Sequence, residues 1–585
     1  LLKMDFLGLR TLNVVGDSLA LIRAGGGPDM QSADIPMDDE SVYQMISAGD
    51  TVGVFQLESG GMTSFLMNMK PQNFEDIVAA ISLYRPGPME SIPRFIQGKQ
   101  NPASVKYLTP KLEPILNVTY GCMVYQEQVM QIVRDLAGYS MGRSDLVRRA
   151  MAKKKHDVMA KEKEYFIHGK LNDDGTIDVP GAVRLGVSEE AAEKLFDEMT
   201  AFASYAFNKS HAAAYGVVAV QTAWLKRHYL TEFMAALINS VAGDSEKVAF
   251  YIEYCRRRGI RVLPPDVNRS EEKFSVDFSG AEKAIRFGLN AVKNVGHNAV
   301  AALIAEREKN GPYRELSGFI TRSASAQINK KAVESLIKAG AFDSLSGNRA
   351  QKLCVYEKLM DGAQKKAHSI LDGQLSLFGD DEPAAPAEYP LMEEYPTRVR
   401  LNMEKEMTGI YLTGHPLEDY KQQLAALDVN AQYLASYAEE HQEGDMSIDQ
   451  MRVKMGGIIT EKRAKATKAG GMMGILTQED LYGSTEAIVF PKVYERLSNQ
   501  LEVGTVAILS GRLSAREDER PKLILDTVAP MRTDRELAAM PKPAPAPAAR
   551  VNPSTKLYLR MERAQLDAVS FILETTPGDM RVYFY

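Results

Sequence analysis

The chain has 585 residues, 45% of them hydrophobic and 25% charged, and a formal net charge of −6. That length is too great for one hydrophobic core, so about three to five domains are expected. The negative charge argues against a protein that coats nucleic acid over its whole surface, three isolated cysteines argue against a disulfide framework or a thiolate metal site, and no apolar run approaches the roughly 18 residues of a membrane span.

The N-terminal part, up to about residue 240, has helical periodicity, with amphipathic stretches over 122–137 and 212–240. The chain opens at Leu1 with neither an initiator Met nor a signal peptide. We therefore expect the natural N-terminus upstream and a reducing, cytoplasmic location. Farther along, the prolines of Tyr84–Pro88 predict a rigid loop that presents Arg85.

A dense basic cluster lies between residues 143 and 155. Its basic residues are Arg143, Arg148, Arg149, Lys153, Lys154 and Lys155. Asp145 is the single acidic residue in the same stretch. Most charged runs are solvated faces, and that interpretation is favoured for a second cluster at 256–261. The first cluster is denser and suits phosphate groups, although two adjacent arginines are not expected to share one helix face.

The prolines Pro264 and Pro265 mark a boundary. After it, residues 285–296 and 328–340 each predict a short helix that ends near a glycine, with another helix following. Such units are similar to helix-hairpin-helix motifs, in which a glycine turn and a helix N-terminus face a phosphate. An ordinary helical hairpin with a glycine C-cap fits the local pattern equally well.

A compact peptide, Gln374–Phe378, precedes a segment at 380–396 that is rich in Ala, Pro and Glu and predicts a solvated linker. On an exposed segment, Leu377 and Phe378 suit insertion into the groove of a partner while Gln374 forms hydrogen bonds. Without further context, one turn of a core helix is the favoured alternative.

The sequence pattern changes from helices to strands, which are predicted at 453–460, 472–478, 485–490, 506–512 and 522–526. Gly456 and Gly457 in the first strand, and Gly511–Leu513 in the fourth, are typical of an OB-type barrel, a fold that commonly binds single strands. Tyr482 and Tyr494 are its few aromatics expected to be exposed. A Pro/Ala linker follows at 541–553, and residues 555–585 predict strand, helix and strand of an incomplete domain.

At this point the motifs, in their order, resemble a known family. They are Lys3–Thr11, Gly53–Ser59, Leu83–Met89, Val124–Gln128, Arg148–Lys154 and Phe207–Tyr215. The chain is similar to the bacterial DNA polymerase III alpha subunits, the C-family of replicative polymerases, from the end of the palm onward. The hairpins, the Gln374–Phe378 peptide and the barrel follow in the order of that family, which favours the functional interpretation of each.

The resemblance implies a multidomain α+β fold: mostly helical fingers and a helix-hairpin-helix region, then an all-β OB-type barrel and a small truncated α/β C-terminal segment. The implied parts are the end of the palm at 1–20, fingers at 21–250, a duplex- and clamp-binding helix-hairpin-helix domain at 251–370, a clamp-binding peptide, linker and helical connector at 371–450, the OB fold at 451–531, a linker at 532–554 and a partial domain at 555–585.

The implied chemistry is template-directed nucleotidyl transfer with two Mg²⁺ ions, held by three aspartates. The first two belong to a Pro-Asp-x-Asp-x-Asp motif that this sequence does not contain, since Ser275–Phe278 is a partial echo in the wrong place. The third matches Asp5, the predicted catalytic and metal-binding residue. The 585-residue chain alone is therefore expected to bind primed DNA without extending it.

The remaining site residues also follow from the resemblance. The predicted nucleotide-binding residues are Arg85, Arg148, Arg149, Lys153, Lys154, Asn208, Ser210 and His211, with His211 expected to contact phosphate or orient a partner. The predicted DNA-binding residues are Lys293, Asn294, Gly296, Lys330 and Lys331, and the predicted clamp-binding residues are Gln374, Leu375, Leu377 and Phe378. The implied partners are primer–template DNA, deoxynucleoside triphosphates, a single-stranded template on the OB domain, the sliding clamp (beta subunit) and the clamp-loader tau subunit, with no membrane.

Two other functions remain open. A catalytically silent DNA-binding scaffold would require that the palm be absent from the natural gene. An error-prone alpha-like polymerase would keep the fingers and hairpins, but the Gln374–Phe378 peptide disfavours it. A Gram-positive replicase with an embedded exonuclease is disfavoured because its OB domain lies near the N-terminus.

Overall fold

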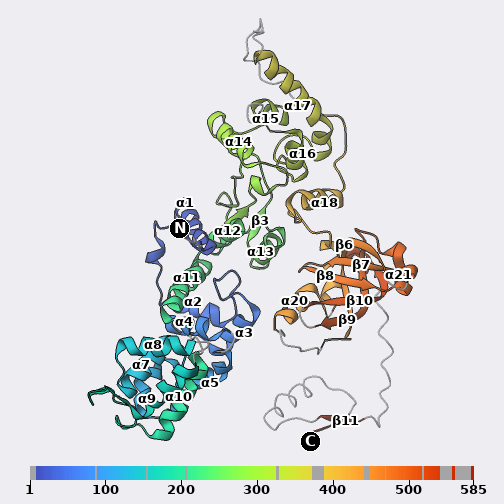
Figure 1. Cartoon of the computed structure of the whole chain (residues 1–585). Helices are drawn as coiled ribbons and strands as arrows, with labels where there is room; N and C mark the ends of the chain where they lie inside the picture. Colours follow the sequence, from blue (N-terminus) through green and yellow to red (C-terminus); the bar gives the residue numbers. More distant parts are fainter. Residues whose placement is uncertain are drawn as a thin grey trace.

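The structure is a computed structural model of the chain (Figure 1). It describes residues 8–85, 88–152, 156–203, 207–323, 328–371, 388–427, 429–440, 448–467, 470–516, 519–539, 556–559 and 581–584. Several predicted site residues therefore lie outside the described residues: Asp5, Lys153, Lys154 and the predicted clamp-binding residues Gln374, Leu375, Leu377 and Phe378. Within those ranges, no helix is both long and apolar enough to cross a bilayer.

The described residues up to Arg257 are mostly helical, as the periodicity predicts. The helices are α1 (Arg10–Ala24), α2 (Glu40–Ser47), α3 (Gly60–Met69), α4 (Phe74–Leu83), α5 (Ile92–Gln100), α6 (Glu113–Leu116), α7 (Gln126–Ala137), α8 (Met141–Ala152), α9 (His156–His168), α10 (Glu189–Ala203), α11 (Lys209–His228), α12 (Leu230–Ser240) and α13 (Ser245–Arg257). A two-stranded hairpin, β1 (Lys170–Leu171) with β2 (Ile177–Val179), follows α9.

Two hydrophobic cores flank the start of α11. One packs α4 and the buried face of α11 around Ile77, Val78 and Val220, and the other packs α7 to α10 around Ile132 and Phe196. Tyr125, at the start of α7, is buried in the first core, while the rest of α7 belongs to the second. The first residues of α7 and α11 thus lie next to each other at the boundary between the two close-packed hydrophobic cores.

A small sheet precedes the helical hairpins. Its strands β3 (Arg261–Leu263), β5 (Ala284–Arg286) and β4 (Ser275–Asp277) lie in that order, with β3 parallel and β4 antiparallel to β5. The helix predicted at the start of 285–296 is therefore wrong, because all three residues of β5 are buried in the sheet and only a 3₁₀ turn at Leu289–Ala291 follows. A short apolar run does not distinguish a strand from a helix.

The hairpin region continues as α14 (His297–Asn310), α15 (Leu316–Arg322), α16 (Lys330–Lys338) and α17 (Arg349–Leu371). The helix predicted over 328–340 is confirmed: Asn329 caps α16 by accepting from the Ala332 amide at 2.8 Å, and Gly340 follows it at a φ of 83°. Asp277, in the partial echo of the metal motif, pairs with buried Arg286 at 2.7 Å. Desolvation raises the pKa of Asp277, but hydrogen bonds from the Ser279 hydroxyl and amide, together with Arg286, lower it to about 2, so its role is structural.

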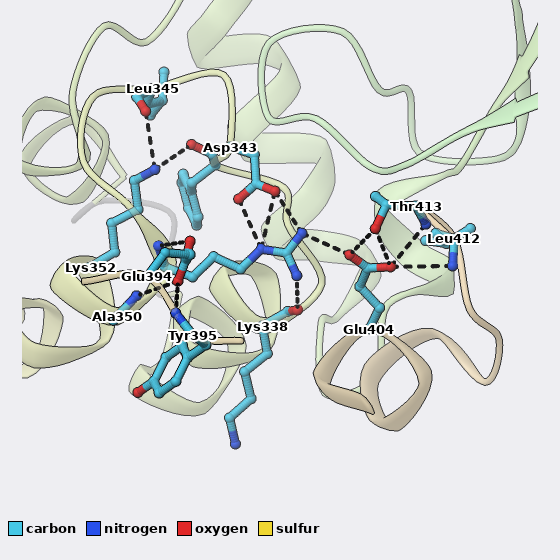
Figure 2. A network of polar contacts seen from close by, with 12 residues as sticks. Lys338, Asp343, Leu345, Ala350, Lys352, Glu394, Tyr395, Glu404, Leu412 and Thr413 are labelled. Atoms are coloured by element: carbon cyan, nitrogen blue, oxygen red, sulfur yellow. Dashed lines mark hydrogen bonds and ion pairs between the residues drawn. The ribbon is translucent and has the colours of Figure 1, made fainter. Parts of the chain in front are cut away.

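Arg349, at the start of α17, forms ion pairs with Asp343 and Glu404. Figure 2 shows these two acids within a network of polar contacts. The Arg349 guanidinium donates to Asp343 and Glu404, at 2.6 and 2.9 Å from Nη2, and to the Lys338 carbonyl. Glu404 belongs to α18 (Thr397–Thr408) and also accepts hydrogen bonds from Thr413. The network therefore joins the turn after α16 to α18, which leads toward the barrel.

The barrel is closed, as the strand pattern predicts. Its strands β6 (Arg452–Ala466), β7 (Met472–Glu479), β8 (Ser484–Val489), β9 (Val506–Arg516) and β10 (Glu519–Pro530) run in the order β10-β8-β7-β6-β9, and β9 pairs again with β10. Helices α19 (Lys421–Ala425), α20 (Ala431–Glu440), α21 (Pro491–Leu497) and α22 (Asp534–Ala539) accompany it. Tyr482 is exposed as expected, but Tyr494 lies over Gly474 and is half-buried, so that expectation is wrong.

The two strands predicted in the last segment are confirmed. Strands β11 (Lys556–Leu559) and β12 (Arg581–Phe584) pair in parallel. The helix predicted between them lies outside the described residues.

Candidate functional site

The motif Val124–Gln128 organises the start of α7. The Gln128 side chain is buried and accepts hydrogen bonds at Oε1 from the Val124 and Tyr125 amides, at 2.8 and 3.0 Å. Its Nε2 donates to the Ile115 carbonyl and to Thr119. This capping box fixes the first turn of α7 and hence the positions of the two residues before Gln128.

Arg148 on α8 reaches that first turn. Its Nη1 donates to Gln126 Oε1 at 3.0 Å, while Nε and Nη2 donate to Asp145 at 3.0 and 2.8 Å. Arg149 pairs with the same Asp145 at 2.7 Å, so the two arginines share one carboxylate. They still differ, since the Arg148 side chain is 25% exposed and that of Arg149 68%.

The N-terminus of α11 meets the same turn from the other side. Asn208 caps the helix by accepting from the His211 amide at 2.9 Å, and its Nδ2 donates to Glu127 at 3.0 Å. The Lys209 amide also donates to Glu127, at 3.1 and 3.2 Å, and the Lys209 ammonium pairs with Glu75 at 2.9 Å. A carboxylate at this position is favourable because helix N-termini carry partial positive charge.

A column of rings runs along α11 beside these contacts. The Arg85 guanidinium lies 3.6 Å from the centre of the Phe207 ring, Phe207 meets His211 at 5.2 Å, and His211 meets Tyr215 at 4.3 Å. The Phe207 backbone forms a bridge with Tyr125 and accepts from the Gln126 amide at 2.9 Å. Arg85 is thereby tied to the start of α7.

We call Arg85, Gln126, Glu127, Arg148, Asn208 and His211 the α7–α11 cluster. Of the predicted nucleotide-binding residues, the structure brings together Arg85, Arg148, Asn208 and His211, and it leaves Arg149 and Ser210 exposed nearby. The sequence reasoning missed Gln126 and Glu127 as site residues. Their signal was present, because both belong to the quoted Val124–Gln128 motif.

The cluster combines fixed cations with compensating acids. Burial holds the pKa of Arg85 below its usual value, yet an arginine stays protonated at neutral pH. Hydrogen bonding from Arg148 holds the pKa of Asp145 below its usual range despite some desolvation. The site can therefore present guanidinium groups and a helix N-terminus to an anionic ligand.

The predicted DNA-binding residues lie on two adjacent turns. The Asn294 side chain donates to Ser335 on α16 at 3.0 Å, which holds the turn before α14 against α16. Gly296 is the N-cap of α14, and a side chain there would meet nothing within 4 Å. Lys293 and Lys331 are exposed, whereas Lys330 pairs with Asp361 at 2.6 Å.

The described residues offer no group of three His, Cys, Asp or Glu side chains that could hold a metal ion. They do not by themselves fit the two-Mg²⁺ site that the resemblance implies. Asp5 lies outside the described residues and stays a prediction.

Comparisons with known proteins match three regions of the chain. Residues 11–174 match the family model described as the bacterial DNA polymerase III alpha subunit finger domain, residues 259–352 a helix-hairpin-helix motif and residues 453–530 an OB-fold nucleic acid binding domain. Relatives named DNA polymerase III subunit alpha include those of Thermus aquaticus, 42% identical over 527 residues, and Mycobacterium tuberculosis strain H37Rv, 38% identical over 544 residues.

These matches cover 89% and 91% of this chain but only 41% and 44% of the two relatives. The chain thus spans about two fifths of the length of the curated relatives that it matches.

Proposed function

Because this chain belongs to the family of bacterial DNA polymerase III alpha subunits, we propose that its α7–α11 cluster binds the triphosphate of an incoming deoxynucleotide during template-directed DNA synthesis. The observation that carries this proposal is the convergence of Arg148 and the α11 N-terminus on one turn of α7. Arginine presents a planar fork of N–H groups to phosphate oxygens, and helix N-termini attract anions.

In this proposal the residues act by binding and orientation. Arg148 and Arg85 offset the charge of the phosphates, and the charge that develops on the leaving pyrophosphate is stabilised by the same fixed cations. We also assign a contact with the nucleotide to His211, which is exposed on α11 and packs between Phe207 and Tyr215. We assign the two-Mg²⁺ chemistry to the complete polymerase, with Asp5 as one ligand, and nucleotide positioning to this part of the chain.

The other regions suit the handling of DNA. We propose that the turns carrying Lys293, Asn294, Gly296 and the start of α16 bind the phosphates of duplex DNA, supported by the match to helix-hairpin-helix motifs. The closed barrel, which matches an OB-fold nucleic acid binding domain, is proposed to bind the single-stranded template. Clamp-loader tau binding and a cytoplasmic location complete the proposal; three cysteines without a disulfide suit a reducing compartment.

Replacing Arg148 with alanine tests the nucleotide site. In single-nucleotide incorporation by the complete polymerase, we expect the KM for the deoxynucleotide to rise about 10- to 100-fold, the range for a lost hydrogen bond to a charged group. The Kd for primed DNA should stay within about twofold, because the cluster is proposed to contact the nucleotide rather than the duplex.

Arg184 provides the matched control, since it is exposed on the same helical body. Arg184→Ala should leave the KM unchanged, and Arg148→Lys, which keeps the charge without the fork, should fall between wild type and Arg148→Ala. An unchanged KM in Arg148→Ala would refute the assignment.

We also propose that Gln374–Phe378 binds the sliding clamp, supported by the linker-like composition of residues 380–396 that follow it and by its place in the family. Changing Leu377 and Phe378 to alanine should weaken clamp binding by about 100-fold or more, as for buried interface anchors, with DNA affinity nearly intact. Leu391 is fully exposed and serves as the control. If a titration of the full chain with the clamp shows equal affinity for both variants and wild type, the assignment fails.

A further inference from the structure

The proposed function assigns phosphate contacts to Arg148 and the α11 N-terminus, but it gives no separate role to Gln126 and Glu127, the two residues that contact them. Gln126 and Glu127 are consecutive in the first turn of α7, so their side chains diverge by about 100°. Gln126 accepts from Arg148 on α8, 22 residues away in sequence. Glu127 accepts from Asn208 and from the Lys209 amide at the start of α11, more than 80 residues away.

The backbone reinforces this arrangement. The Gln126 amide donates to the Phe207 carbonyl, and Tyr125 forms a bridge with Phe207, directly before Asn208. A single rigid turn, capped by Gln128, therefore contacts both Arg148 and the α11 N-terminus.

We propose that Gln126 and Glu127 are positioning residues, which fix Arg148 and the α11 N-terminus at the spacing required by one triphosphate; this inference rests on the proposed function. An arginine side chain loses considerable rotamer freedom when it binds a ligand. Holding it in place beforehand lowers that cost, so preorganisation appears as tighter nucleotide binding.

Burial separates these two residues from a purely structural role. Gln126 and Glu127 are only partly buried, so truncation of either leaves its partners in contact with water. Gln128, by contrast, is 3% exposed and satisfies four groups of the surrounding chain. Truncation of Gln128 should destabilise the fold, whereas truncation of Gln126 or Glu127 should change only the site.

The experiment measures single-nucleotide incorporation and DNA binding by the complete polymerase. We expect Gln126→Ala and Glu127→Ala each to raise the KM for the deoxynucleotide about tenfold, with kcat and the Kd for primed DNA within about twofold. Glu127→Gln should restore the wild-type KM, because its amide oxygen can accept the same hydrogen bonds. Glu190, exposed in the first turn of α10, provides the control variant Glu190→Ala, with an unchanged KM.

Double variants test whether Gln126 acts through Arg148. The variant Gln126→Ala/Arg148→Ala should have the same KM as Arg148→Ala, because the partner that Gln126 positions is already gone. The same holds for Glu127→Ala combined with Asn208→Ala. Additive increases in KM would contradict a positioning role.

The outcomes separate the inference from the proposed function. If neither Arg148→Ala nor Asn208→Ala changes the KM, the proposed function and the positioning role are both refuted. If those variants raise the KM but Gln126→Ala and Glu127→Ala do not, the inference alone is overturned. A lower KM in Glu127→Ala would also overturn it, because the carboxylate would then be a competitor of the phosphate rather than a support.

Discussion

Replacing Arg349 with alanine is expected to lower the free energy of unfolding of the hairpin region by about 3–5 kcal/mol, the usual cost of removing one partner from a buried ion pair. The Arg349 side chain is 2% exposed, and Glu404, which it pairs with at 2.9 Å, is fully buried. Without the guanidinium, Glu404 keeps the hydrogen bonds from Thr413 and Leu412 but no cation. The carboxylate then carries an uncompensated charge away from water (Figure 2).

Hydrogen exchange in urea can localise the effect within the full chain. Amides of α16 and α18 should lose protection in Arg349→Ala, while amides of α7 and α10, whose core is a separate cluster, should keep theirs. Arg463→Ala is the control because the Arg463–Glu461 pair is exposed and contributes little. A loss below about 1 kcal/mol would show that Glu404 is solvated or neutral.

Replacing Gly511 with alanine is expected to destabilise the barrel by about 3 kcal/mol, the upper end of the range for overpacking. Gly511 lies on β9 between Val453 of β6 and Leu525 of β10. A Cβ at this position would overlap the Ile524 carbonyl oxygen, a backbone atom that no side-chain rotation can move. Closure of the barrel thus requires the absence of a side chain here.

Gly362→Ala is the control variant, and it is expected to raise stability rather than lower it. Gly362 lies inside α17, and a Cβ there would meet nothing within 4 Å. Gly362→Ala should therefore stabilise its helix by about 0.5–1 kcal/mol. The free energy of unfolding of each variant is compared with that of the wild type by thermal unfolding, and exchange of the β6 and β9 amides localises the effect of Gly511→Ala. If Gly511→Ala destabilises the chain no more than Gly362→Ala does, the barrel relaxes around an added methyl group.

The Arg349 network also includes contacts with residues 390–395. Glu394 accepts from the amides of Arg349 and Ala350, and so caps α17 from a distant segment. Asn348 and Gln351 donate to the Met392 and Pro390 carbonyls. Residues 390–395 are thus held against the first turn of α17.

Much of the fold could be predicted where local patterns are strong. Alternation and glycine placement predicted the five barrel strands. The structure confirms them, with β6, β7, β9 and β10 longer than predicted and β8 shifted by one residue. The strand β5 was missed because a run of three buried residues has no distinguishing period. The exposure of Tyr494 was predicted wrongly because its ring packs on Gly474, a residue of β7 that is distant in sequence.

The sequence by itself determined the family, through motifs that occur in a fixed order, and the residue types that suit a phosphate ligand. It also determined the helices and barrel strands whose periodicity is local. Only the tertiary structure decided which cations share a site, because the contacts of Arg148 with Gln126 and of Asn208 with Glu127 join separate elements. Side-chain pairing over such separations depends on how two cores pack, which no local pattern encodes.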